Sequence, residues 1–194
     1  TTLLEEFKRD AYLSIERGIS LNPVLNSFQK VVHQFNIEKE LIDSFLKSMT
    51  MDLEKKEYTE EGYKEYILGS AEVVGLMCLR VFTERDNRLY QDLKPFAMAL
   101  GSAFQKINFL RDLNADYVGM GRIYFPNVDM RNLNENIKQE IEADIEIDFN
   151  TGLKGIKMLP KRSRLGVYVA YIYYRSLFNK IRGVKSKHIL NTRV

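Results

Sequence analysis

Helix-length amphipathic segments cover most of this 194-residue sequence, and they constrain its fold more than any other feature. Apolar residues recur at helical spacing within these segments. Several of the segments follow residues that favour a helix start, such as Asn22-Pro23 and Thr59. No segment has the alternating pattern of a strand, and the chain has only four prolines. The sequence therefore predicts an all-α bundle that forms a single domain over residues 1–194.

Proline and glycine set the expected helix boundaries. Pro160 is expected to start the last long helix, which runs to Arg182. Pro95 is expected to kink or restart the helix that begins near residue 86, because proline removes a backbone donor. Gly152 and Gly155 are expected to form a break after an acidic helix over residues 134–148. Between residues 59 and 82, interior glycines suggest either close helix packing or room for a long ligand chain.

The segment from Gly101 to Asp116 carries a polar stripe. Gln105, Asn108, Asp112 and Asp116 are spaced by three, four and four residues, which places them on one helix face between apolar neighbours. Two carboxylates four residues apart repel each other, and more so when they are partly buried. Hard oxygen donors at this spacing suit Mg²⁺. A hydrogen-bonded polar seam against another helix is the alternative interpretation.

A glycine-containing loop follows the stripe. Gly119-Met-Gly-Arg-Ile-Tyr-Phe-Pro126 ends the helix and carries Arg122 and Tyr124 directly after the carboxylates. Such a loop could close over a charged ligand. A plain helix stop is the alternative.

Together these residues resemble a known family. Gln105-Lys-Ile-Asn-Phe-Leu-Arg-Asp-Leu-Asn-Ala-Asp116 with Gly121-Arg-Ile-Tyr-Phe-Pro126 is similar to the second aspartate-rich signature of the phytoene/squalene synthases, which are head-to-head prenyl transferases. Tyr66-Ile-Leu-Gly-Ser-Ala-Glu-Val-Val-Gly75 and Tyr174-Arg-Ser-Leu-Phe-Asn-Lys-Ile181 resemble two further motifs of the same family. The resemblance spans roughly residues 23–193.

This resemblance implies the isoprenoid synthase fold, a helical bundle around a central cavity, and a prenyl transferase that depends on Mg²⁺ or Mn²⁺. Two geranylgeranyl diphosphates would give phytoene through a cyclopropyl diphosphate in carotenoid biosynthesis. A squalene or dehydrosqualene synthase using farnesyl diphosphate is the alternative, with NADPH needed only if squalene forms. Carried over residue by residue, the family's roles fall on the metal ligands Asn108, Asp112 and Asp116, the catalytic Asp112, Asp116 and Tyr174, and the substrate-binding Gln105, Arg111, Arg122, Tyr66 and Gly75.

The sequence also departs from the family pattern. Ala115 stands where the family often has an acidic residue, and Glu72 where it usually has glycine. The family's first aspartate-rich motif is not among these 194 residues. We therefore expect a fragment that lacks the upstream helices of the cavity and is inactive by itself.

Charge is distributed unevenly along the chain. Residues 149–194 hold eleven Lys or Arg and no acidic residue. A basic end of this kind fits an anionic membrane surface, a diphosphate pocket or a solvated face. No groove-reading motif accompanies it, so a nucleic-acid partner is not expected. A non-catalytic helical binding module and a membrane-surface protein remain alternatives to the enzyme.

Several other residues are interpreted without a role in catalysis. The single cysteine, Cys78, excludes an internal disulfide, suits a reducing cytoplasm and is interpreted as a buried core thiol. Asp52 is interpreted as a surface or capping carboxylate. The carboxylates Glu140, Asp144 and Asp148 share one face, and because no Asn, Arg or glycine loop joins them they are interpreted as solvated.

Overall fold

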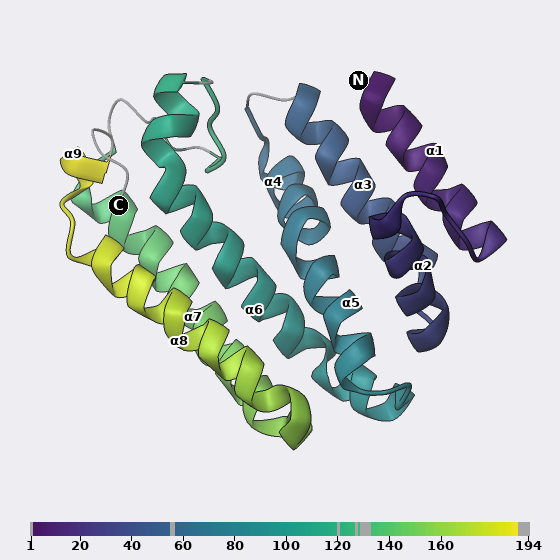
Figure 1. Ribbon diagram of the computed structural model, residues 1–194. Coiled ribbons are helices and arrows are strands. Elements are labelled where there is room, and N and C mark those ends of the chain that lie inside the picture. The colour runs from purple at the N-terminus through teal and green to yellow at the C-terminus, as the bar shows by residue number, and fades with distance from the viewer. Residues whose placement is uncertain (1, 55–56, 120, 127, 129–132, 190–194) are drawn as a thin grey trace.

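Helix α6 (Asn87–Asn114) runs through the middle of the molecule, with the remaining helices arranged on either side of it (Figure 1). The computed structural model describes residues 2–54, 57–119, 121–126, 128 and 133–189. Within these ranges the one β feature is an isolated bridge between Glu57 and Ile123, so the predicted all-α class is confirmed. The other elements are α1 (Thr2–Arg17), α2 (Pro23–Phe35), α3 (Lys39–Glu54), α4 (Glu60–Ile67), η1 (Leu68–Glu72), α5 (Val73–Phe82), η2 (Ala115–Gly119), α7 (Glu135–Met158), α8 (Lys161–Arg182) and α9 (Ser186–Ile189).

The predicted capping residues begin these helices. Asn22 accepts hydrogen bonds from the backbone of residues 24 and 25, and Thr59 accepts one from the N–H of Gly62. Asp86 and Asn134 cap α6 and α7 in the same way. Each cap satisfies backbone N–H groups that a helix start leaves without a partner, which stabilises the helix by about 1 kcal/mol.

The restart considered at Pro95 and the break expected at Gly152 and Gly155 are absent, and packing explains both. Helix α6 is continuous through Pro95, and α7 is continuous through Gly152 and Gly155 to Met158. A Cβ at Gly155 would lie 2.3 Å from the Cβ of Phe96, and one at Gly152 would lie 3.0 Å from Leu100. These glycines therefore let α7 approach α6 closely instead of breaking it. Helix α6 has its most extensive contact with α7, and this packing supports α6 across its proline.

The core lies where α6, α7 and α8 meet. Ile107, Phe149 and Phe178 come from these three helices, and none of them has any exposed surface. On the other side of α6, η1 packs against both α6 and α3. This element is a single π-helical turn within the predicted 59–82 helix, and turns of this kind are frequent near functional sites.

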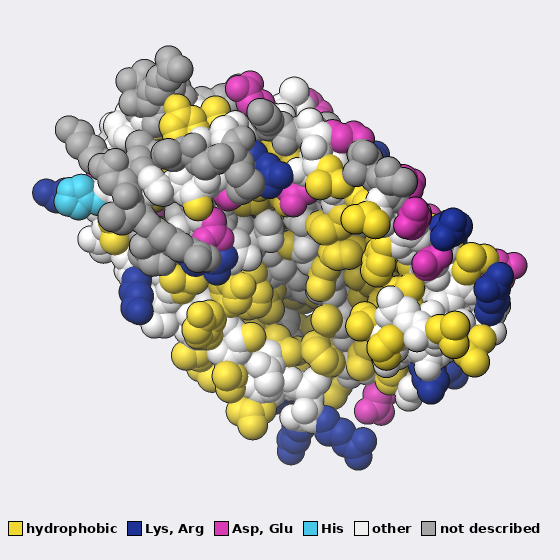
Figure 2. All heavy atoms as spheres, turned by 45° about the horizontal axis from the view of Figure 1, so that its top comes forward, with side chains coloured by type: hydrophobic (Ala, Val, Ile, Leu, Met, Phe, Trp, Pro, Cys, Tyr) yellow, Lys and Arg dark blue, Asp and Glu magenta, His cyan; other side chains and the backbone are white. Residues whose placement is uncertain are grey.

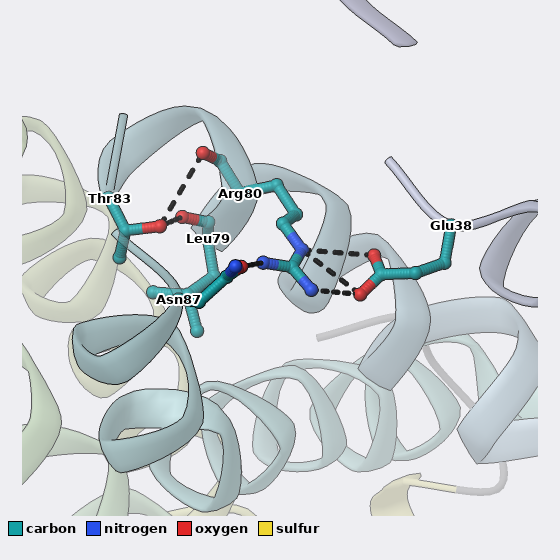
Figure 3. A network of polar contacts seen from close by, with 5 residues as sticks. All are labelled: Glu38, Leu79, Arg80, Thr83 and Asn87. Atoms are coloured by element: carbon teal, nitrogen blue, oxygen red, sulfur yellow. Dashed lines mark hydrogen bonds and ion pairs between the residues drawn. The ribbon is translucent and has the colours of Figure 1, made fainter. Parts of the chain in front are cut away.

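A buried arginine, Arg80, connects the loop before α3 to the start of α6. Arg80 of α5 donates to both carboxylate oxygens of Glu38 at 3.0 Å and to Asn87 at 2.8 Å (Figure 3). Its guanidinium also stacks 3.4 Å from the Tyr90 ring. Burial raises the pKa of Glu38, but the contact with Arg80 outweighs it and leaves that pKa below its usual value. The pair connects the loop before α3 to α5 and α6, which helps to fix the wall of the cavity described below.

Candidate functional site

Helix α6 carries the predicted polar stripe toward its C-terminal end. Asn108 and Asp112 lie on α6, and Asp116 follows in η2. The side chain of Asp112 is only 23% exposed, and Asp116 is also partly buried. Arg111 donates from Nε to both carboxylate oxygens of Asp112 at 3.1 Å. The stripe is therefore a semi-buried, charged face and not a set of side chains in bulk solvent.

The loop after η2 turns back toward this face. Gly121 has a φ of +65°, which favours glycine, and its N–H donates to Tyr117. The N–H of Arg122 donates to the carbonyl of Asp116 at 2.9 Å. The Arg122 guanidinium reaches Asp52 at 3.2 Å and the Tyr124 hydroxyl at 3.4 Å. The loop thus brings a second arginine to the carboxylates.

The charges at this end of α6 act on one another. Burial raises the pKa of Asp116, and the negative charges of Asp112 and Asp52 raise it further, while Arg122 and Arg111 oppose this. The raised pKa reflects burial first, and the two neighbouring carboxylates second. A divalent cation would relieve this crowding, so oxygen donors from Asn108, Asp112 and Asp116 fit Mg²⁺ chemically.

The described side chains do not form a complete metal centre. Across residues 2–189 with the stated gaps, no three His, Cys, Asp or Glu side chains come close enough to hold a metal ion by themselves. Mg²⁺ commonly keeps water molecules and binds through one or two carboxylates together with phosphate oxygens. A partial set of this kind would need further oxygen donors, such as those of a phosphate, to hold the ion.

Tyr174 lies beside the same face. Its ring stacks on Phe104 with centroids 3.9 Å apart, and its hydroxyl lies 3.4 Å from the side-chain oxygen of Asn108. Helix α8 therefore places an aromatic ring between the polar stripe and the apolar space below it.

An apolar cavity of about 690 Å³ continues from the polar stripe. The lining includes three predicted substrate or catalytic residues, Gln105, Gly75 and Tyr174, at positions that α6, α5 and α8 supply. Figure 2 shows apolar side chains gathered around a hollow on this face of the molecule. The remaining lining residues are Ser70, Ala71, Val74, Cys78, Leu79, Phe82, Leu93, Phe96, Ala97, Leu100, Gly101, Phe104, Gly152, Gly155, Ile156, Leu159, Arg162, Ser163, Gly166, Val167 and Ala170.

Two interpretations of single residues are corrected here. Cys78 is not a buried core thiol, since its side chain is exposed in the wall of the cavity. Protein nevertheless surrounds it, and this partial desolvation raises the pKa of its thiol. Asp52 is not merely a surface or capping carboxylate, because it pairs with Arg122 and accepts a hydrogen bond from the Tyr66 hydroxyl at 3.1 Å.

Tyr66 lies beside the predicted site and does not line the cavity. It is 5% exposed and packs among the rings of Tyr58, Phe109 and Tyr124. Its hydroxyl reaches the charged face only through Asp52. Arg193, the last residue of the segment that resembles the family, lies outside the described residues.

The acidic face of α7 is not simply solvated. Lys106 of α6, itself only 8% exposed, forms ion pairs with Asp144 and, at 2.7 Å, with Asp148, and Ser102 donates to Asp148 at 2.9 Å. Burial raises the pKa of Glu72 to about 7, Asp148 adds to this, and Lys106 opposes it. These side chains form a polar network between η1, α6 and α7. The interpretation of a solvated face was wrong for Asp148, whereas Asp144 pairs with Lys106 but stays exposed, as interpreted.

Comparison with known proteins agrees with this geometry. The family model described as squalene/phytoene synthase matches residues 2–194. A 4,4'-diapophytoene synthase of Staphylococcus haemolyticus is 28% identical over 141 residues, which cover 64% of this chain and 48% of that protein. A phytoene synthase of Pseudescherichia vulneris is 34% identical over 106 residues, which cover 54% of this chain and 33% of that protein. The chain thus spans between a third and a half of the length of these curated relatives.

Solved structures share the fold. The squalene synthase HpnC from Alicyclobacillus acidocaldarius has a TM-score of 0.77 at 18% identity, covering 92% of this chain and 72% of that one. A dehydrosqualene synthase in complex with a ligand has a TM-score of 0.80 at 24% identity, covering 93% and 68%. The family match over nearly the full sequence, the shared helical fold and the charged face above an apolar cavity lead to one conclusion: this chain belongs to the squalene/phytoene synthase family.

Proposed function

We propose that the protein condenses two prenyl diphosphates head to head. The observation that carries this is the charged face of α6, with Asn108 and Asp112, which leads directly into an apolar cavity. The cavity follows α6 from Gln105 to Leu93, and twelve residues of helix correspond to roughly 18 Å. A ligand with a diphosphate head and a long apolar tail would match both features, with the head at the charged face and the tail in the cavity.

Specific side chains would hold the diphosphate. Asn108, Asp112 and Asp116 would bind Mg²⁺, with Mn²⁺ as the alternative ion, and such an ion neutralises the charge of a departing diphosphate. Arg111 and Arg122 would bind phosphate oxygens through their planar donor groups. Gln105, at the cavity end of the stripe, would orient the diphosphate above the tail.

The cavity would protect the reacting carbon centres. Its wall is predominantly apolar, so a carbocation formed there would be shielded from water. The ring of Tyr174 faces this space, and aromatic faces stabilise cations by about 0.5–2 kcal/mol. These are the roles that we propose for Tyr174 and for the lining of the cavity.

We propose a product of the phytoene or diapophytoene type, because the two curated relatives are a phytoene synthase and a 4,4'-diapophytoene synthase. Two geranylgeranyl diphosphates are the first expectation, and farnesyl diphosphate giving dehydrosqualene or squalene is the alternative. NADPH would be required only for squalene. Carotenoid biosynthesis is the corresponding proposed role.

The test is turnover by the full-length protein. With Mg²⁺ and geranylgeranyl or farnesyl diphosphate, we expect release of pyrophosphate and an apolar condensed hydrocarbon, identified by mass spectrometry. A chelator should stop the reaction, and added Mg²⁺ should restore it. If neither substrate releases pyrophosphate with Mg²⁺ or Mn²⁺, the proposal is wrong and a non-catalytic binding module becomes the better account.

Peripheral binding at the inner face of a membrane is a second proposal. The outer face of α8 exposes Leu165, Val169 and Tyr173, each at least 60% accessible. Lys161 and Arg164 lie at the N-terminal end of the same helix. Apolar side chains next to basic ones favour an anionic lipid surface. No described helix is long and apolar enough to cross a bilayer.

Vesicle binding tests this second proposal. Each basic residue near an anionic surface contributes about 1 kcal/mol, so neutralising Lys161, Arg162 and Arg164 together should weaken binding to phosphatidylserine vesicles by about 100-fold. Salt should weaken binding of the unaltered protein. A matched control replaces the exposed Arg17, Lys30 and Arg88 with glutamine. Equal losses in the two triple variants would show that net charge, and not the α8 surface, governs binding.

A further inference from the structure

Asp52, near the C-terminal end of α3, links three parts of the chain at the charged face. Its carboxylate accepts from Arg122 at 3.2 Å and from the Tyr66 hydroxyl at 3.1 Å, and its backbone carbonyl accepts a further hydrogen bond from Arg122. Arg122 is 70 residues away in sequence. No catalytic or ligand-binding role follows for Asp52 from the resemblance.

We propose that Asp52 is a positioning residue, which fixes Arg122 in the orientation required to bind the substrate diphosphate. This inference rests on the proposed function. A guanidinium has five N–H donors, and the described contacts of Arg122 with Asp52 and Tyr124 amount to three hydrogen bonds. Arg122 is therefore held from one side and keeps donor capacity for phosphate oxygens.

The aromatic cluster behind Asp52 makes this support rigid. Tyr66 is buried, and its ring packs against Tyr58, Phe109 and Tyr124. Tyr124 also stacks on Phe109 of α6 with centroids 4.1 Å apart, which anchors the loop that carries Arg122. Two successive hydrogen bonds, from Tyr66 to Asp52 and from Arg122 to Asp52, therefore connect the Arg122 guanidinium to a buried ring.

Asp52 also keeps the Arg122 guanidinium from pairing with the Asp116 carboxylate. The positive charge of Arg122 opposes the raised pKa of Asp116, so the guanidinium lies within electrostatic reach of this second carboxylate, which could attract it. An Arg122 paired with Asp116 would occupy oxygen atoms that a cation needs. By holding Arg122, Asp52 leaves the Asp116 carboxylate available to Mg²⁺.

A double-mutant cycle tests this role. We would measure kcat and KM for pyrophosphate release from geranylgeranyl diphosphate, and the Mg²⁺ concentration for half-maximal rate, in Asp52→Asn, Arg122→Gln and the double variant. Losing a charge-assisted contact should lower kcat/KM about 10- to 100-fold in Asp52→Asn and raise its Mg²⁺ requirement. If Asp52 acts through Arg122, the double variant should be no more than about twofold worse than Arg122→Gln.

The controls separate positioning from general stability. Glu54→Gln removes an exposed carboxylate two residues further along α3 and should stay within about twofold of the unaltered enzyme. Tyr66→Phe removes only the hydroxyl that bonds to Asp52, and should lower kcat/KM by about 3- to 10-fold. This variant carries the test if Asp52→Asn does not fold.

The outcomes distinguish this inference from the function on which it rests. All variants are made in the full-length protein, and an unaltered full-length enzyme without turnover overturns both. An active enzyme whose Asp52→Asn variant keeps its kcat/KM and Mg²⁺ requirement overturns only the positioning role. Losses that multiply fully in the double variant do the same, since they would show that Asp52 acts independently of Arg122.

Discussion

Replacing Asp112 or Asp116 with asparagine is expected to abolish detectable turnover, with kcat lowered by at least about 10²- to 10³-fold. Asparagine keeps the size of the side chain and one oxygen, but it removes the negative charge that would bind Mg²⁺. Asp112 would lose its ion pair with Arg111, and Asp116 would lose the charge that its burial already disfavours. The rate of pyrophosphate release from geranylgeranyl diphosphate measures the effect.

The helix itself should survive these substitutions. Both side chains are partly exposed, so circular dichroism and the thermal midpoint should change little. Asp92→Asn, at an exposed position of the same helix, is the matched control and should keep full activity. Retained activity in Asp112→Asn or Asp116→Asn would show that the acidic face has no part in the mechanism. Loss of helix content in a variant would show that its loss of activity comes from misfolding.

Filling the cavity is expected to give the second large effect. Gly166 of α8 lines the cavity, and a Cβ built there would meet no atom within 4 Å. Gly166→Phe would therefore add a ring at the wall of the cavity without a clash of its Cβ, in the space that we propose for the prenyl tail. We expect kcat/KM for geranylgeranyl diphosphate to fall by about 100-fold or more, while replacement of a helix-interior glycine should leave stability unchanged or raise it.

Two further glycine variants serve as controls. Gly166→Ala should keep most of the activity and stabilise the fold by up to about 1 kcal/mol. Gly155→Ala should instead destabilise the protein, because its Cβ would overlap Phe96. Full activity of Gly166→Phe towards geranylgeranyl diphosphate would contradict the placement of the tail in this cavity.

Local signals predicted much of the fold. Capping side chains at Asn22, Thr59 and Asp86 act within two or three residues, so sequence spacing was enough to place those helix starts. The helix restart considered at Pro95 and the break expected at Gly155 were wrong, because the local tendency of these residues to interrupt helices is overridden by packing between α6 and α7. Contacts between distant segments decide such cases, and spacing along the chain does not reveal them.

The same distinction applies to the site. The shared face of Asn108, Asp112 and Asp116 follows from helical periodicity, and their proposed role as ligands remains a prediction. The pairing of Asp52 with Arg122 spans 70 residues and depends on tertiary structure, so no local pattern indicated it. The salt bridges of Lys106 to the α7 carboxylates were missed for the same reason. The family motif associated Tyr66 with the site, and in the structure its hydroxyl contacts the charged face only through Asp52.

A crystal structure of the full-length protein with Mn²⁺ and an unreactive thiodiphosphate analogue of geranylgeranyl diphosphate would test the central claim most directly. Mn²⁺ can be located by its anomalous scattering. We predict an ion within coordination distance of Asp112 and Asp116, with the prenyl tail running past Gln105 between Gly75 and Gly166. Metal bound away from both aspartates, or a tail lying outside the cavity, would contradict the account.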